Sequence, residues 1–184
     1  MLSVLRPLCL SLALSAPLAA PAQAERAQQG LLALFAPMQK GGPDRAARAE
    51  VKAAVKVALA NPPRGRIWCV PFARAVSGVE IRGNAKTWWD QAKGRYGRGH
   101  EPRVGAVMAF AASRAMPKGH VAVVSKVIDD RTVLVDQANW ERNRITLDTV
   151  VVDVSAKGDW SQVRVANEAG SFGRTNPVKG FIYN

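Results

Sequence analysis

The stretch "GHVAVVSKVIDDRTVLVDQANW", residues 119–140, predicts a β-hairpin with a histidine and two side-chain amides at its open end. Apolar residues alternate with other residues on both sides of Asp129 and Asp130, which is typical of half-buried strands. A loop centred on these two residues gives paired residues whose numbers sum to 259, so His120 lies directly opposite Asn139. Opposed side chains have Cβ atoms about 4.5–5.5 Å apart, close enough for an amide oxygen to accept a hydrogen bond from the imidazole.

Three side chains compete to orient His120 in this hairpin. Gln137 shares a strand face with Asn139, whereas Asp136 points to the opposite face because side chains alternate along a strand. A slip of one residue in the pairing would exchange the two faces. Asn139 is therefore our first candidate, Gln137 the second, and Asp136 the alternative after a slip. Trp140 could shield the pair from water.

The elements around the hairpin indicate the fold class. Apolar residues at helical spacing, with glycine or proline at the ends, predict helices at residues 28–38, 44–60, about 71–76 and 84–93. After residue 105, period-two segments follow one another: "AVMAF", the hairpin, "ITLDTVVVDV", "QVRVA" and "KGFIY". Helices first and about six antiparallel strands afterwards predict an α+β fold, with N-terminal helices packed on an antiparallel sheet.

The first 24 residues predict a secretory signal peptide. Arg6 forms a short positive region, "PLCLSLALSAPLAA" an apolar one, and "AQA" at residues 22–24 a cleavage site of small residues. No later segment approaches the roughly 20 apolar residues of a spanning helix, so we expect no transmembrane segment. We expect an exported protein, in the periplasm or outside the cell, with residues 25–63 as a basic helical N-terminal extension.

The charge balance suggests an anionic partner. Removal of Arg6 with the signal peptide leaves 25 basic against 14 acidic residues, a net charge of about +11. An exported basic protein meets anionic lipid and the carboxylates of the cell-wall polymer, although the charge could equally serve solubility. No basic run is interleaved with aromatics, so we expect no nucleic-acid partner. Metal-ligand spacing is absent, so we expect neither a metal nor another cofactor.

A single cysteine would remain after export. Cys9 leaves with the signal peptide, so Cys69 in "RIWCVPFAR", residues 66–74, cannot form an internal disulfide. It is either a small buried apolar residue or a nucleophile, and the start of a helix would stabilise its thiolate. A nucleophile needs a base. His100 lies in a glycine-rich charged loop, whereas His120 opens a strand, which holds geometry better.

A thiol at a helix start, a histidine at a strand start and an amide on the paired strand form the Cys-His-Asn arrangement of papain-type catalysis. The segments "CVPFAR", "SGVEIRGNAKTWWDQA", "EPRVGAVMAF", "GHVAVV", "DQANW" and "VKGFIY" resemble, in this order, the CHAP domain, the cysteine- and histidine-dependent amidohydrolase/peptidase group. The resemblance implies a papain-like α+β catalytic domain over residues 64–184. Cys69 would be its nucleophile, acting with His120. Many members carry glutamate where this chain has Gln137.

The resemblance implies hydrolysis of an amide bond in the peptide part of peptidoglycan. Asn139 or Gln137 would orient the histidine, and Trp68 and Trp140 would line the substrate cleft. Two alternatives remain open. One is a weakly active or inactive module that binds wall peptide or a partner protein, and the other is an amidase for a small exported amide. We expect a monomer.

Overall fold

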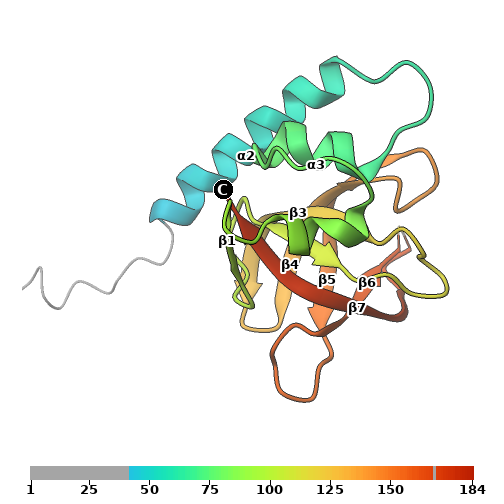
Figure 1. Cartoon of the computed structure of the whole chain (residues 1–184). Helices are drawn as coiled ribbons and strands as arrows, with labels where there is room; N and C mark the ends of the chain where they lie inside the picture. Colours follow the sequence, from blue (N-terminus) through green and yellow to red (C-terminus); the bar gives the residue numbers. More distant parts are fainter. Residues whose placement is uncertain (1–41, 168) are drawn as a thin grey trace, which may run out of the picture. The chain divides into compact units, whose positions relative to one another are not determined.

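Antiparallel strands are the main regular structure of the described chain, which comprises residues 42–167 and 169–184 of this computed structural model (Figure 1). The predicted signal peptide and the helix expected at residues 28–38 lie outside these residues. In chain order the elements are α2 (Gly42–Ala60), α3 (Cys69–Ser77), the 3-10 helix η1 (Ala85–Thr87), α4 (Trp88–Gln91), β1 (Gly97–Gly99), β2 (Val107–Phe110), β3 (His120–Asp129), β4 (Thr132–Ala138), β5 (Ile145–Asp153), β6 (Gln162–Ala166) and β7 (Phe172–Tyr183). No described helix is both long and apolar enough to cross a membrane.

The hairpin predicted over residues 119–140 is confirmed as β3 and β4. Val123 pairs with Asp136 and Val124 with Val135, which is the predicted register. Nearer the turn the register shifts by one, so that Lys126 pairs with Leu134. The open end of the hairpin, where the candidate site lies, therefore keeps the alternation of faces that the sequence predicts.

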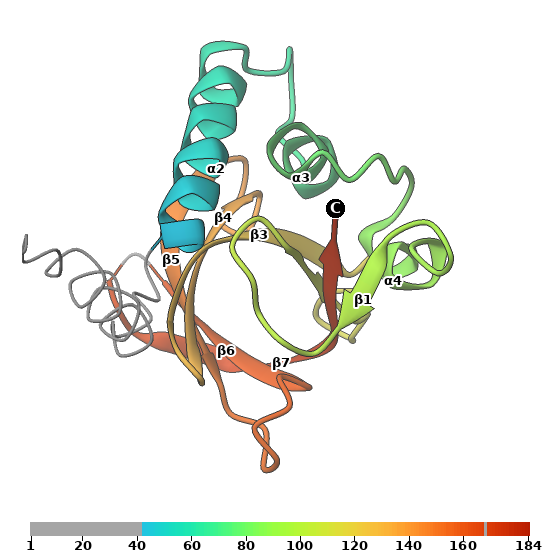
Figure 2. The same cartoon turned by 90° about the vertical axis from the view of Figure 1, so that its left-hand side faces the viewer.

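The predicted fold class is wrong, because the strands close into an antiparallel barrel instead of forming the open sheet that was expected, and the few short helices lie outside it. The order β2-β3-β4-β5-β6 ends on β7, which pairs with β6 and also with β2, and the short β1 pairs with β7. Figure 2 shows the strands arranged around the centre of this barrel. Period two identifies strands and their faces, but it does not identify which strands pair.

The length and bending of β7 make the closure possible. Its first half pairs with β6, and its second half pairs with β2 across a register shift between Ala109 and Phe110. Gly180 lies opposite Ala109 with φ +138°, and a Cβ there would stand 2.6 Å from the carbonyl oxygen of Gly99. Only glycine fits this backbone and this close approach, so Gly180 marks the point where the strand changes direction.

Two apolar clusters lie on the two faces of the barrel strands. Met108, Phe110 and Val124 belong to the cluster inside the barrel. Because side chains alternate along a strand, His120 on β3 and Gln137 on β4 point to the same inner face. The other cluster joins the outer face of β2 and β3 to the helices; its buried members include Val51, Val55, Phe72, Val76, Val107, Val121 and Val123. Burial of such side chains contributes about 1.5–3 kcal/mol each. Helices α2 and α3 are thus held against the strand that begins with His120.

Two cations of α2, Arg48 and Lys52, bind carboxylates of the barrel strands. The Nζ of Lys52 lies 2.9 and 2.8 Å from the two carboxylate oxygens of Asp136, whose side chain is fully buried. Asp148 accepts hydrogen bonds from Lys52 at 2.9 Å, from Arg48 at 3.1 Å and from the Ser125 hydroxyl at 2.7 Å. This network fixes α2 to β3, β4 and β5 beside the candidate site.

Lys52→Met is expected to lower the free energy of unfolding by about 2–4 kcal/mol, because it leaves the buried Asp136 carboxylate without its counter-ion. Lys56→Met is the matched control. It removes the same charge one turn further along α2, at an exposed side chain, and is expected to change the free energy by less than about 0.5 kcal/mol. Denaturant unfolding measures both variants, and equal losses would contradict a stabilising role for the Lys52–Asp136 pair.

Candidate active site

Cys69 is the first residue of α3, as the sequence predicts. The preceding residue, Trp68, is extended, with φ −127° and ψ 147°, and its side chain does not cap the helix. The thiol is free and half-buried. Burial raises the pKa of the Cys69 thiol, while hydrogen bonds to the backbone of Val121, Val70 and Cys69 itself oppose that increase. The helix start therefore offers partners to a thiolate, but burial keeps the resting sulfur protonated.

His120 begins β3 directly after a glycine that no other residue could replace without strain. Gly119 has φ +68°, and a Cβ there would lie 2.6 Å from the backbone N and 2.8 Å from the Cα of Lys86. The chain passes this closely because the Lys86 N–H donates to the carbonyl oxygen of Lys118, at 2.8 Å. The contact between η1 and the start of β3 thus fixes where the imidazole enters the site.

Gly119→Ala is expected to displace His120 and to lower the free energy of unfolding by more than about 2 kcal/mol, since the Cβ adds a backbone overlap to the cost of a positive φ. Gly94→Ala is the control, because Gly94 has φ +74° but no atom within 4 Å of the added Cβ. Thermal unfolding of both variants separates overlap from backbone strain. If both variants lose the same free energy of unfolding, the added Cβ at residue 119 is accommodated without an energetic cost, and the prediction is wrong.

Gln137 is the side chain that orients the histidine. Its Oε1 lies 2.9 Å from Nε2 of His120, and both side chains are buried. An amide oxygen can only accept, so Nε2 carries the proton and Nδ1 keeps the lone pair. Burial lowers the pKa of His120 to about 4, with the bond to Gln137 opposing that shift. The rings of Phe110 and Trp140 lie edge-on to the imidazole, at 5.4 and 5.1 Å between centroids.

Asn139, our first candidate for this role, has a different partner. Strand β4 ends at Ala138, and Asn139 takes φ +61°, so the strand alternation no longer sets its direction. Its Oδ1 accepts from the backbone N–H of Asn143 at 2.9 Å, and the Oδ1 of Asn143 accepts from the N–H of Ile67 at 2.8 Å. Asn139 therefore stabilises the loop that holds the chain two residues before Cys69.

Asp136 faces away from the histidine, as the unslipped register predicts. Its carboxylate binds Lys52 and accepts from the backbone N–H of Asp148 at 2.8 Å. His100, which the sequence suggests is a surface residue, is exposed and stacks loosely on Trp89 at 6.0 Å between ring centroids. Within the described residues, His120 is thus the histidine that shares a site with the cysteine.

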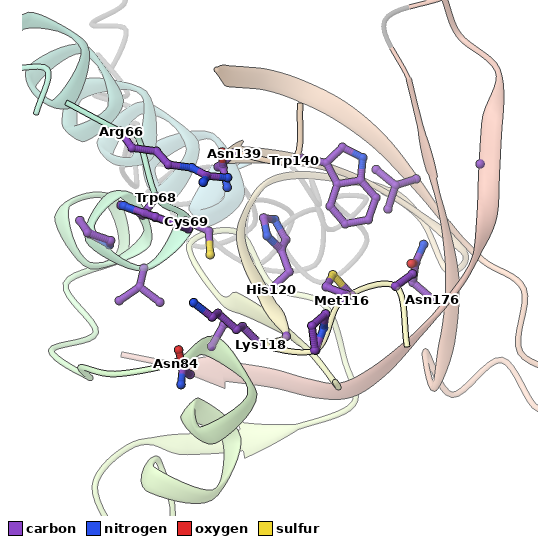
Figure 3. A pocket seen from close by; sticks show the side chains of 18 of the residues that line it. Arg66, Trp68, Cys69, Asn84, Met116, Lys118, His120, Asn139, Trp140 and Asn176 are labelled. Atoms are coloured by element: carbon purple, nitrogen blue, oxygen red, sulfur yellow. The ribbon is translucent and has the colours of Figure 1, made fainter. Parts of the chain in front are cut away.

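One cleft of about 960 Å³ brings the candidate residues together. Figure 3 shows the Cys69 sulfur, from α3, and the His120 ring, from the start of β3, entering the same space. The cleft is lined by Trp68, Cys69, His120, Asn139 and Trp140, and also by residues that sequence reasoning did not select, namely Arg66, Asn84, Met116, Lys118, Arg174 and Asn176. Gln137 is buried behind the imidazole.

Two of these missed residues could have been found in the sequence, because they lie close to Cys69 or His120. Arg66 lies three positions before the cysteine, and Lys118 lies two positions before the histidine. No sequence pattern marks Asn176, because the closing of the barrel by β7 brings it to the cleft. Among residues 42–167 and 169–184, no cluster of three or more His, Cys, Asp or Glu side chains could hold a metal ion.

A thiol at a helix start and an imidazole oriented by an amide, in one cleft, are the groups of a cysteine hydrolase. A family model, the CHAP domain, matches residues 61–139, and the resemblance seen in the sequence is confirmed. The match contains Cys69, His120, Gln137 and Asn139. It points to a hydrolase of the cysteine-peptidase type, either an amidohydrolase or a peptidase. No curated protein matches the chain.

Proposed function

We propose that the chain is an exported cysteine amidase or endopeptidase that hydrolyses an amide bond in the peptide part of peptidoglycan. The observation that carries this proposal is the hydrogen bond from His120 Nε2 to Gln137 Oε1, at 2.9 Å. It leaves the Nδ1 lone pair as the base available in the cleft that also contains Cys69. A thiol nucleophile and an unprotonated imidazole nitrogen as its general base are the two enzyme groups that acyl transfer requires.

The reaction would run in two steps on these residues. Nδ1 of His120 takes the thiol proton as Cys69 Sγ attacks the amide carbonyl, and the backbone N–H of Cys69 stabilises the oxyanion. The imidazolium then gives its proton to the leaving amine, the C–N bond breaks and a thioester remains. Water, deprotonated by the same imidazole, attacks the thioester, releasing a carboxylic acid and restoring the thiol.

The location belongs to the same proposal. The signal-peptide pattern of the first 24 residues supports export to the periplasm or the cell exterior, where peptidoglycan is found. The basic surface supports it as well, because stem peptides carry carboxylates. The chain would act as a monomer on the polymer or on its peptide fragments.

Mass spectrometry of purified wall fragments incubated with the protein tests this function directly. We expect new products that together exceed the substrate by the mass of one water, and their masses identify the bond. Treating the protein beforehand with iodoacetamide should stop product formation, since Cys69 is the free cysteine of the described chain. Products that form equally after alkylation would contradict thiol catalysis.

Binding without catalysis is the second candidate, and the electrostatics of the site favour it. Burial raises the pKa of Cys69 and lowers that of His120, and Gln137 adds no negative charge to stabilise an imidazolium. The rate of Cys69 alkylation across pH separates the candidates. Alkylation below pH 8.5 that is slower in His120→Ala indicates a thiol activated by the imidazole, whereas alkylation only above about that pH, at the same rate in both proteins, indicates a module that binds wall peptide or a partner protein.

A further inference from the structure

Every described side chain with a full charge that lines the cleft is cationic. Arg66, Lys118 and Arg174 contribute to its walls, and no aspartate or glutamate among residues 42–167 and 169–184 does. The described chain contains carboxylates elsewhere that pair with arginine and lysine, as Asp148 does with Arg48. The charged side chains of the described walls therefore create a positive potential around the thiol, and a partly enclosed, low-dielectric cleft strengthens it.

Two of these cations contact Trp68, the residue that precedes the nucleophile. The guanidinium carbon of Arg66 lies 4.3 Å from the ring centroid of Trp68, and the Nζ of Lys118 lies 5.9 Å from the same centroid. Figure 3 shows them approaching Trp68 and Cys69 from different sides of the cleft. Neither forms an ion pair with a carboxylate of residues 42–167 or 169–184. Both charges are therefore available to an anion that enters the cleft beside Trp68.

The backbone on both sides is held in place. The N–H of Ile67 donates to Asn143 Oδ1 at 2.8 Å, which fixes the chain next to Arg66. The carbonyl oxygen of Lys118 accepts from the N–H of Lys86 at 2.8 Å. Trp68, 43% exposed, offers its ring as a platform for the guanidinium. A stacked guanidinium keeps the N–H groups of its edge free, and that edge matches the two oxygens of a carboxylate.

We propose that Arg66 and Lys118 form a carboxylate-binding subsite beside Cys69, so that the preferred substrate is a wall peptide with a free carboxylate close to the amide that is cut. This inference rests on the proposed function and names the substrate feature that the site selects. Arg66 binds the carboxylate through its planar edge, and Lys118 contributes a second charge. A carboxamide at the same position cannot accept a charge-assisted bond and gains less.

Kinetics on two matched substrates test the subsite. One is a wall-peptide fragment with its carboxylates intact, and the other is the same fragment with its carboxylates converted to carboxamides. In Arg66→Gln/Lys118→Gln we expect KM for the carboxylate fragment to rise about 10- to 100-fold with kcat little changed, and the carboxamide fragment to be nearly unaffected. Lys56→Gln/Lys126→Gln, at two exposed lysines on α2 and β3 outside the cleft, is the control for loss of the same net charge.

Calorimetric titration of Cys69→Ala with both fragments separates this inference from the proposed function. Tighter binding of the carboxylate fragment, lost when Arg66→Gln/Lys118→Gln is added, supports the subsite even if the unmodified protein cleaves neither fragment; that outcome rejects hydrolysis alone. Equal binding of both fragments, or no binding of either, overturns the subsite even where cleavage is observed. Equal kinetic losses on both fragments, or an equal loss in Lys56→Gln/Lys126→Gln, overturn it as well.

Discussion

Cys69→Ala and His120→Ala are each expected to lower the rate of wall-peptide hydrolysis by about 10⁴- to 10⁶-fold, and the double variant is expected to be no slower than the slower single variant. The reason is that the two side chains act as one unit. Without the thiol the imidazole has no proton to accept, and without the imidazole the buried thiol, whose pKa is raised, stays protonated. Once one of the two side chains is lost, removing the other therefore causes no further loss of rate.

Single-turnover assays of the two single variants and the double variant on one purified fragment measure this coupling. Thermal unfolding should accompany them, because His120 is buried against Phe110 and Trp140 and its loss leaves space there. His120→Gln, which fills more of that space without providing a base, is the companion variant. A double variant that loses the product of the two single losses would show that Cys69 and His120 act independently, and the proposed mechanism would fail.

The parts of the fold that the sequence predicts are those set by neighbours in the chain. Alternation on both sides of Asp129 and Asp130 fixes the hairpin, its register at Val123 and Val124, and the strand on which His120 stands. Barrel closure depends instead on the pairing of β7 with β2 and with β6. The pattern of residues within one strand does not indicate which other strand it pairs with. For this reason the strands were predictable and the barrel was not.

The candidate site shows the same division between local and distant information. Hairpin register places Gln137 and Asn139 on the face of His120, but register applies only while the chain remains in the strand. Asn139 leaves it with a positive φ and binds Asn143, so the choice between the two amides depended on where β4 ends. The pairing of Lys52 with Asp136 was also hidden, because a helix pattern shows a charge but not the buried carboxylate that it meets.

The charge of the orienting residue sets how readily the pair of Cys69 and His120 ionises. Burial holds the pKa of His120 at about 4, and the Gln137 amide opposes this only weakly because it is neutral. Proton transfer from thiol to imidazole creates two charges in a buried place, and each pH unit by which the His120 pKa rises favours the ion pair about tenfold. In Gln137 the Nε2 is also buried without a hydrogen-bond partner, so a carboxylate oxygen would replace an unsatisfied donor.

Gln137→Glu is therefore expected to raise the pKa of His120 by about 1–3 pH units, through a carboxylate in direct contact with the imidazolium. Alkylation of Cys69 at pH 6 should then accelerate by at least about tenfold. NMR titration reports the imidazole directly, with the exposed His100 as internal reference, and iodoacetamide reports the thiol. Gln137→Met, of similar size but with no oxygen to accept, is the matched control and should show neither change.

Stability should move in the same direction at acidic pH. In the unmodified protein the folded-state pKa of His120, about 4, lies below the ordinary value of 6.5, so the unfolded state binds more protons between these values. The contribution of the neutral imidazole to the free energy of unfolding is therefore fully present above pH 6.5 and is lost as the pH falls toward 4. Gln137→Glu should shrink that loss, because the folded state then accepts the proton too. Alkylation and unfolding profiles identical to those of the unmodified protein would mean that the residue at 137 does not control the charge of His120.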